Sequence, residues 1–209
     1  MYQAIKIDSY DAYEPYISAY TMNIHYNKHY KKYLDNLNNL ISKYNYDYTK
    51  EELVQNIDMF PLSERGNILF NLGGVLNHEM YFDILGNGNL SESLSNKINA
   101  DFGSFDNFKE EFIKSANTLV GSGYTFLVVN KEGNLVLNKD KKLEIINVAN
   151  QDTPYSYGLI PIMNIDLWEH AYYLDYQNRK DEYINNFFSI VDFSKVSNNY
   201  EKAKIQENL

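Results

Sequence analysis

Histidine side chains are the clearest candidates for chemistry in this chain, which has four of them and no cysteine. Imidazole and carboxylate groups without thiolates are the ligands expected for iron, manganese or zinc in a site of nitrogen and oxygen donors. His25 and His29 stand four positions apart, so on a helix they would share one face, and Tyr33 would extend that stripe. This spacing makes the pair a candidate for metal binding.

Asp166 and His170 form a second pair with the same spacing, in the segment DLWEH, and His78 stands alone within an expected helix. Each residue also has an ordinary structural reading. A single histidine is often a hydrogen-bonded core or surface residue, an aspartate before a helix can cap it, and Glu169 would favour the helix dipole. Spacing alone therefore leaves both interpretations open.

The elements that must position these residues begin with two long helices. The first is expected over residues 18–44, with Ser18 as its N-cap, because apolar residues recur there at helical spacing. The second is expected from Pro61 towards residue 85. The run Gly86–Asn89 ends it, since glycine and asparagine clusters interrupt helices, and we predict a boundary between two parts of the protein there.

The second part mixes helices with strands. A helix capped by Ser104 ends near Gly121, and after it the pattern becomes rich in β-forming residues. Strands are expected at residues 124–130, 135–138, 143–148 and 160–165, with a hairpin turn at 131–134. Helices are expected at residues 168–176 and 181–191. The polar residues from Ser194 onward are expected to be loosely attached.

Composition limits the classes of function. The formal charge of −9 disfavours a nucleic-acid partner, which needs a basic face, but it does not exclude a small anionic substrate. An aromatic content of 15% supplies ample side chains for a core. We find neither a signal peptide nor an apolar run of the roughly 20 residues that span a bilayer, so no membrane partner is expected. The expected location is cytoplasmic.

Five segments, in order along the chain, resemble the iron/manganese superoxide dismutase family. The segment DLWEHAYYLDYQNR at 166–179 is similar to the most diagnostic signature of that family. Residues 17–41 resemble its first helix, and NHEMYF at 77–82 resembles its second histidine element. GSGYTFLVV and NQDTP match two further landmarks. The similarity extends over residues 10–193, nearly the whole chain.

The resemblance implies an α+β fold and an enzyme. An N-terminal α-hairpin domain of two long helices, residues 1–87, would join a C-terminal domain, residues 88–209, in which helices flank a three-stranded antiparallel sheet. The metal site would lie between them. The reaction would convert two superoxide anions and protons to dioxygen and hydrogen peroxide. One alternative is a metal-binding relative with a structural or assembly role and little activity. A metal-dependent hydrolase would lack a free general base of the H-E-x-x-H kind.

The resemblance also assigns the ligands. His25, His78, Asp166 and His170 would bind one manganese or iron ion, and a solvent molecule would take the fifth position. His29 would then lie outside the ligand set. Zinc has no redox cycle between the 3+ and 2+ states, so a zinc-loaded form would be inactive.

Four further residues receive roles from the same resemblance. Tyr33 and His29 would be a gateway pair that lines the substrate channel, and Trp168 would form a wall of the metal pocket. A glutamine of this family binds the metal-bound solvent, from the second helix in iron-type members and from the sheet in manganese-type members. Because Gly74 occupies the helix position and Gln151 the sheet position, the pattern is manganese-like, although iron fits as well.

The family pattern further implies a homodimer, and a tetramer is equally open. Glu169 would reach the partner's ligand histidine, and Tyr173 would approach the partner's His29. Lys28 and Arg179 are the basic residues expected nearest the entrance for the superoxide anion, although both could be ordinary surface charges.

Several aromatic positions depart from the common pattern. Tyr30 stands where a second histidine is frequent, Phe82 where tryptophan is usual, and Tyr124 and Phe126 where two tryptophans are common. Each keeps a ring, so we expect the packing to be retained while the polarity of the pocket changes. The segment 127–150 is several residues longer than typical, which predicts an extended β-hairpin.

Overall fold

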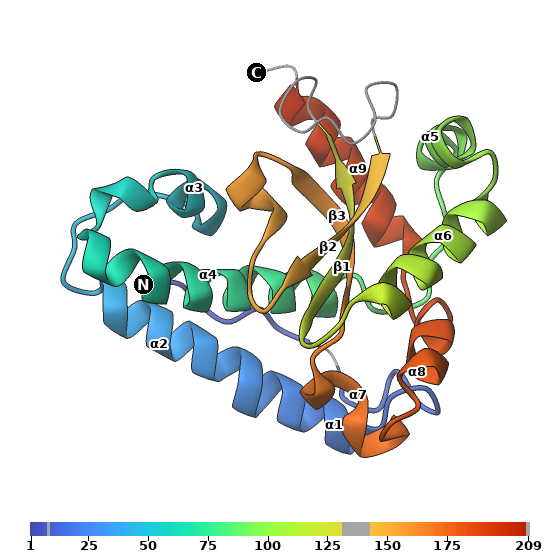
Figure 1. Cartoon of the computed structure of the whole chain (residues 1–209), viewed down its shortest axis with the longest axis horizontal. Coiled ribbons are helices and arrows are strands. Elements are labelled where there is room, and N and C mark those ends of the chain that lie inside the picture. The colour runs from blue at the N-terminus through green and yellow to red at the C-terminus, as the bar shows by residue number, and fades with distance from the viewer. Residues whose placement is uncertain (8, 131–142, 208–209) are drawn as a thin grey trace.

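A helical hairpin and a three-stranded sheet with helices around it make up the chain (Figure 1). The structure is a computed structural model and describes residues 1–7, 9–130 and 143–207. The two long helices of the hairpin lie side by side, and the sheet packs against the second of them. The predicted α+β class, with an N-terminal α-hairpin and a three-stranded antiparallel sheet, is confirmed.

The first long helix begins where the sequence predicts. The Ser18 hydroxyl accepts a hydrogen bond from the Thr21 amide, and α1 (Ala19–Ile24) follows. A π-helical segment (His25–Tyr30) then leads into α2 (Lys31–Ile41) without a break. A π segment is rare and occurs mostly at functional sites. In this chain the π-helical segment contains both histidines of the predicted pair, His25 and His29.

The second arm of the hairpin follows two short helices. A capping box of Thr49 and Glu52 begins α3 (Lys50–Gln55). A 3₁₀ turn, Ile57–Met59, leads to α4 (Leu62–Asp83), which starts after Pro61 as predicted. Because α4 packs against α2 and also against the sheet, side chains around much of its middle are buried.

The sheet has the strand order β2-β1-β3 and is antiparallel throughout. Its strands are β1 (Gly123–Val129), β2 (Leu143–Ala149) and β3 (Ile160–Asp166). Every residue of β1 and β3 is buried, since α4 and α9 pack on this sheet, whereas β2 is partly exposed. Antiparallel pairing places Tyr124 of β1 directly opposite Asp166, the last residue of β3.

The remaining helices surround the sheet and connect it to the hairpin. They are α5 (Glu92–Phe102), α6 (Phe105–Thr118), the 3₁₀ turn η3 (Pro154–Tyr157), α7 (Glu169–Tyr176), α8 (Lys180–Phe187) and α9 (Phe193–Glu207). Ser104 caps α6 by accepting from the Asn107 amide, as the sequence predicts. Helices α3 and α5 were not predicted from the sequence.

The prediction that residues from Ser194 onward are loosely attached is wrong. This segment forms most of α9, which packs against β3. Val196, Tyr200 and Ala203 are all buried, and their spacing of four and three residues marks one helix face. The overall polarity of the segment conceals this narrow apolar stripe.

Two predictions fall outside the described residues. The turn at 131–134 and the strand at 135–138 lie within residues 131–142, which the structure does not describe. The extended hairpin at 127–150 is described only at its two ends, where Val129 pairs with Leu143.

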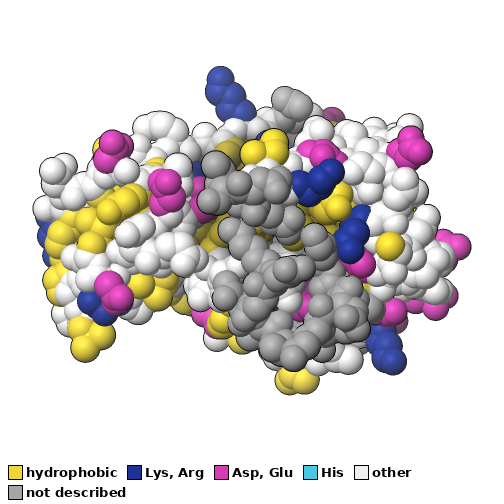
Figure 2. All heavy atoms as spheres, turned by 90° about the horizontal axis from the view of Figure 1, so that it is seen from above, with side chains coloured by type: hydrophobic (Ala, Val, Ile, Leu, Met, Phe, Trp, Pro, Cys, Tyr) yellow, Lys and Arg dark blue, Asp and Glu magenta, His cyan; other side chains and the backbone are white. Residues whose placement is uncertain are grey.

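Among the described residues, no helix is long and apolar enough to cross a membrane. On the face seen in Figure 2, acidic and basic side chains are scattered and no histidine is visible.

The packing of α9 predicts a large effect of charge at its buried face. We expect Val196→Asp to lower the free energy of unfolding by about 3 kcal/mol or more, because an unpaired carboxylate would be buried. The exposed Asn198→Asp is the matched control and should change it by less than about 0.5 kcal/mol. Urea unfolding followed by circular dichroism measures both. Equal stabilities of the two variants would contradict the packing of α9.

Candidate metal centre

Four elements from distant parts of the chain meet at one point. His25 lies at the start of the π-helical segment, and His78 lies in the buried middle of α4. Asp166 ends β3, and His170 lies in the first turn of α7. The Asp166 carboxylate accepts from the Trp168 amide at 2.8 Å, which fixes the turn between strand and helix. The structure thus brings together the four residues predicted as ligands.

The donor atoms of this cluster converge on one carboxylate oxygen. The Nε2 atom of His25 lies 3.2 Å from Oδ2 of Asp166, and those of His78 and His170 each lie 3.7 Å from it. All four donor atoms lie within 4.8 Å of one another. His25, His78 and Asp166 are fully buried, whereas His170 retains 12% side-chain exposure. A cation bonded at about 2.0–2.2 Å to each donor fits this separation.

Hydrogen bonding leaves the inward-facing nitrogens free. Nε2 of His78 and Nε2 of His170 are buried and have no hydrogen-bond partner. Nδ1 of His78 donates to the Gly74 carbonyl at 2.6 Å, so the lone pair of this ring lies on Nε2. Buried polar atoms without partners are costly unless a ligand satisfies them.

The charge states suit a metal ion. Burial lowers the pKa of His25 and lowers that of His78 further, so both rings are neutral donors. Burial alone would raise the pKa of Asp166, but the neighbouring imidazoles of His170 and His25 outweigh it and hold that pKa well below its usual range. Three imidazoles and one carboxylate, with no thiolate, form a donor set that fits manganese or iron.

His29 lies beside the cluster and is not a member of it. Its ring stacks on His170 with centroids 4.0 Å apart and an interplanar angle of 15°. Burial, followed by the nearby His170, lowers the pKa of His29 to about 4. The rings of His25 and His29 lie 6.5 Å apart, and of the two only His25 contributes a donor atom to the group.

Trp168 and Gln151 also lie beside the residues of the site. The Trp168 ring stacks near His170, with centroids 5.6 Å apart, and its indole N–H donates to the Asn150 carbonyl at 3.0 Å. Asn150 has a positive φ of 55°, which asparagine tolerates, and this turn directs the next residue inward. The buried Gln151 donates through Nε2 to the Tyr33 hydroxyl at 3.2 Å.

Two adjacent glycines in α4 make this arrangement possible. A Cβ atom at Gly74 would lie 2.6 Å from the ring of Tyr33, and one at Gly73 would lie 1.8 Å from the Gln151 carbonyl oxygen. Any larger residue would displace Tyr33 or the sheet from the cluster. From the sequence, Gly74 was recognised only as the position without a glutamine, because a steric requirement of this kind depends on which chain segments approach the helix.

Aromatic rings close the space around the histidines. Phe82 packs against His25 with centroids 4.9 Å apart, and the Tyr124 ring lies 6.2 Å from His78. The Tyr30 hydroxyl turns away from the cluster and donates to Glu79 at 2.8 Å. The packing expected at these departures from the family pattern is present, and only Tyr124 brings a new polar group to the cluster.

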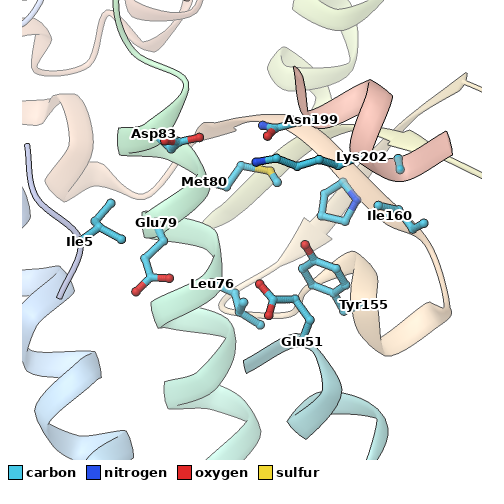
Figure 3. A pocket seen from close by; sticks show the side chains of 12 residues that line it. Ile5, Glu51, Leu76, Glu79, Met80, Asp83, Tyr155, Ile160, Asn199 and Lys202 are labelled. Atoms are coloured by element: carbon cyan, nitrogen blue, oxygen red, sulfur yellow. The ribbon is translucent and has the colours of Figure 1, made fainter. Parts of the chain in front are cut away.

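A cavity beside the sheet is separate from this cluster. A pocket of about 310 Å³ lies between α3, α4, β3 and α9, and Figure 3 shows Glu79 and Met80 of α4 beside Tyr155 and Lys202. None of the four cluster residues lines this pocket.

Fold and site together define a mononuclear metalloprotein with nitrogen and oxygen donors, held between a helical hairpin and an α/β part. The model of the iron/manganese superoxide dismutase α-hairpin domain matches residues 4–86, and that of the C-terminal domain of the same family matches residues 90–199. The chain belongs to the iron/manganese superoxide dismutases, a family of oxidoreductases.

Named relatives agree with this assignment. The chain is 41% identical over 199 residues to a protein named superoxide dismutase [Mn/Fe] from Methylomonas sp. (strain J), covering 93% of this chain and 95% of the relative. It is 40% identical over 201 residues to proteins named superoxide dismutase [Mn] from Listeria monocytogenes and Listeria innocua, covering 94% of this chain and 95% of each.

The cluster predicts which side chains retain a metal. We expect His78→Ala and Asp166→Ala to lose bound manganese or iron, because each removes a donor and leaves the other donors poorly satisfied. Tyr33→Phe is the control: it removes a hydroxyl that contacts Gln151 and should keep its metal. Elemental analysis of the purified variants measures this. Full metal content in either donor variant would overturn the assignment of the ligands.

Proposed function

We propose that this superoxide dismutase works at one manganese or iron ion held by His25, His78, Asp166 and His170. The convergence of three histidine Nε2 atoms on the Asp166 carboxylate, in a buried space without other partners, is the observation that carries the proposal. When bound, an ion that alternates between the 3+ and 2+ states supplies the oxidation of one superoxide and the reduction of a second. The protein must supply geometry, charge and protons.

The donor residues set the charge of the centre. Asp166 stays ionised at neutral pH, while His25 and His78 are neutral. The centre therefore contributes a single negative charge that partly neutralises a bound cation. The remaining positive charge favours the approach of a small anion such as superoxide.

Tyr33 and Gln151 are suited to proton supply. The Tyr33 hydroxyl accepts from Gln151, so its own hydrogen is free to be donated to a substrate or a bound solvent. Burial raises the pKa of Tyr33, which keeps it a neutral phenol. Peroxide formation consumes protons, and a hydrogen-bonded pair that holds one at the site assists this step. His29, half-buried on the outer side of His170, would line the approach with Tyr33, and Trp168 would limit the access of water.

Gly74 and Gln151 support manganese as the resident metal. With no side chain at position 74, the glutamine of the sheet is the one that reaches the site from beside Tyr33. Its hydrogen bond to solvent would tune the reduction potential. The relatives are named for manganese alone or for both manganese and iron, so iron also fits.

The activity test compares metals. Protein stripped of metal and reloaded with manganese should consume superoxide, reloading with iron should give measurable activity, and reloading with zinc should give none, because zinc has no redox cycle. A cytochrome c reduction assay with a superoxide generator measures the rates. A protein that binds manganese and iron but consumes no superoxide with either would support a structural or assembly role instead.

A homodimer is supported by an exposed aromatic and apolar surface next to the site. Tyr20 of α1 is 66% exposed, and Tyr173 and Leu174 of α7 are each 48% exposed, while α1 and α7 pack together. Glu169 lies exposed on the same helix as the ligand His170. Burying this surface against a second copy would cover the open side of His170. A tetramer and a cytoplasmic location are further proposals that follow from the family.

We also propose that residues 1–87 and 88–209 form two domains. The two family models match residues 4–86 and 90–199, so they meet close to this boundary.

The dimer proposal predicts a change in association. Tyr173→Ala should raise the dimer dissociation constant at least tenfold, about 1.4 kcal/mol, because interface tyrosines often dominate binding energy. Glu92→Ala, an exposed residue at the start of α5, is the control and should leave it unchanged. Analytical ultracentrifugation over a dilution series measures both. Identical dissociation constants for the two variants would argue against this surface as the interface.

A further inference from the structure

Two buried asparagine side chains connect the elements that carry the donor residues. Asn164 of β3 is fully buried and lies two residues before Asp166, so the two side chains point to the same face of the sheet. The Asn164 side-chain amide donates to the backbone carbonyl of Asn77 in α4 at 2.9 Å. Because Asn77 directly precedes His78, this contact joins the strand of Asp166 to the helix of His78.

The side chain of Asn77 makes a second contact, to the loop that follows β2. Its amide donates to the backbone carbonyl of Asp152 at 2.9 Å. One turn earlier in α4, Gly73 lies so close to this loop that a Cβ atom there would be 1.8 Å from the Gln151 carbonyl oxygen. Two successive carbonyls of the loop therefore rest on successive turns of α4. Their positions fix the backbone of Gln151, whose side chain donates to the Tyr33 hydroxyl.

The acceptors determine how both carboxamide groups are oriented. A backbone carbonyl can only accept a hydrogen bond, so the carboxamide that faces it must present its nitrogen. The partners are 87 residues apart for Asn164 and Asn77, and 75 residues apart for Asn77 and Asp152. Neither contact is thus a local cap or turn, which such side chains often form. Together they connect β3, through α4, to the loop of Gln151.

Stability alone does not account for two carboxamides at this position. Among the described residues, the Oδ1 atoms of Asn77 and Asn164 are buried and have no hydrogen-bond partner. Such an acceptor costs at least as much free energy as one hydrogen bond contributes, and an apolar side chain of the same shape would avoid that cost. What Asn164 adds to the molecule is therefore its specific connection to α4.

We propose that Asn164 is a positioning residue of the metal centre, which acts through Asn77 to hold Asp166, His78 and Gln151 in one arrangement. This inference rests on the proposed function. Asn164 and Asn77 do not bind the ion in this proposal; they fix the relative positions of the three elements that carry its surroundings.

Asn164→Leu tests this proposal, because leucine is similar in size and cannot donate a hydrogen bond. We expect the affinity for Mn²⁺, in competition with a chelator, to weaken roughly tenfold, as it does when groups that orient metal ligands are lost. The electron paramagnetic resonance spectrum of the Mn²⁺-loaded protein should change, because it reports the arrangement of donors around the ion. The urea midpoint of the metal-free protein should be unchanged or higher, since an unpartnered acceptor is removed.

Asn199→Leu is the matched control. The Asn199 amide of α9 donates to the backbone carbonyl of Ile162 at 3.2 Å, so it makes the same kind of contact with the same strand. Asn199 lines the pocket of Figure 3, which is separate from the cluster. This variant should keep its affinity for Mn²⁺ within about twofold of wild type and leave the spectrum unchanged.

The outcomes are distinct. Weaker Mn²⁺ binding and an altered spectrum in Asn164→Leu alone, with the urea midpoint of the metal-free protein retained, support the proposal. Wild-type affinity in Asn164→Leu overturns it. A loss of affinity that comes with a lower midpoint, or that Asn199→Leu shares, also overturns it, because that is a general effect on packing. Wild-type protein that retains no metal, or retains it without consuming superoxide, would refute the proposed function instead, and this is measured before either variant.

Discussion

A fully buried carboxylate, Asp166, is the constraint on which the rest of the molecule depends. An ionised group in a dry interior costs several kcal/mol unless it is paired, and the loss of one partner leaves that cost uncompensated. Three histidines approach Asp166 within 3.2 to 3.7 Å, and two of them are themselves buried and neutral. Neutral rings cannot compensate the charge alone. A cation at their centre satisfies all four groups together, so its binding and the packing of the core are coupled.

This constraint explains why elements so distant in sequence must be held accurately. His25 and His78 come from the two arms of the hairpin, and Asp166 and His170 flank the junction of β3 and α7. The glycine pair at 73 and 74 allows the sheet and the first helix to approach α4 closely. Because sheet register places a side chain on one face or the other, a one-residue slip of β3 would remove Asp166 from the cluster. The fold therefore acts as a precise support for a small number of donor atoms.

The sequence predicted those helices of the fold that are marked by local features, namely capping residues and periodic apolar segments. Caps at Ser18 and Ser104 and the long periodic segments mark helices that the structure confirms. The ligand set came from ordered motifs and their family resemblance, since spacing alone favoured His29 as strongly as His25. The π-helical segment at residues 25–30 was not predicted, because apolar residues at helical spacing do not distinguish it from the α-helices on either side. The helix α9 was missed because three buried residues among many polar ones give a weak periodic signal.

The departures from the family pattern show how such a centre can change while its donors stay fixed. Phe82 and Phe126 keep aromatic surface in the core and add no polar atom, so they alter packing alone. The Tyr30 hydroxyl donates to Glu79, away from the metal donors, and Glu79 also forms a partly buried ion pair with Lys50. Tyr124 differs from these three, because the register that brings Asp166 to the centre brings the Tyr124 hydroxyl there too. Tyr124, opposite a proposed ligand on the neighbouring strand, therefore brings a hydroxyl to the donor residues, whereas the Tyr30 hydroxyl is bonded to Glu79 instead.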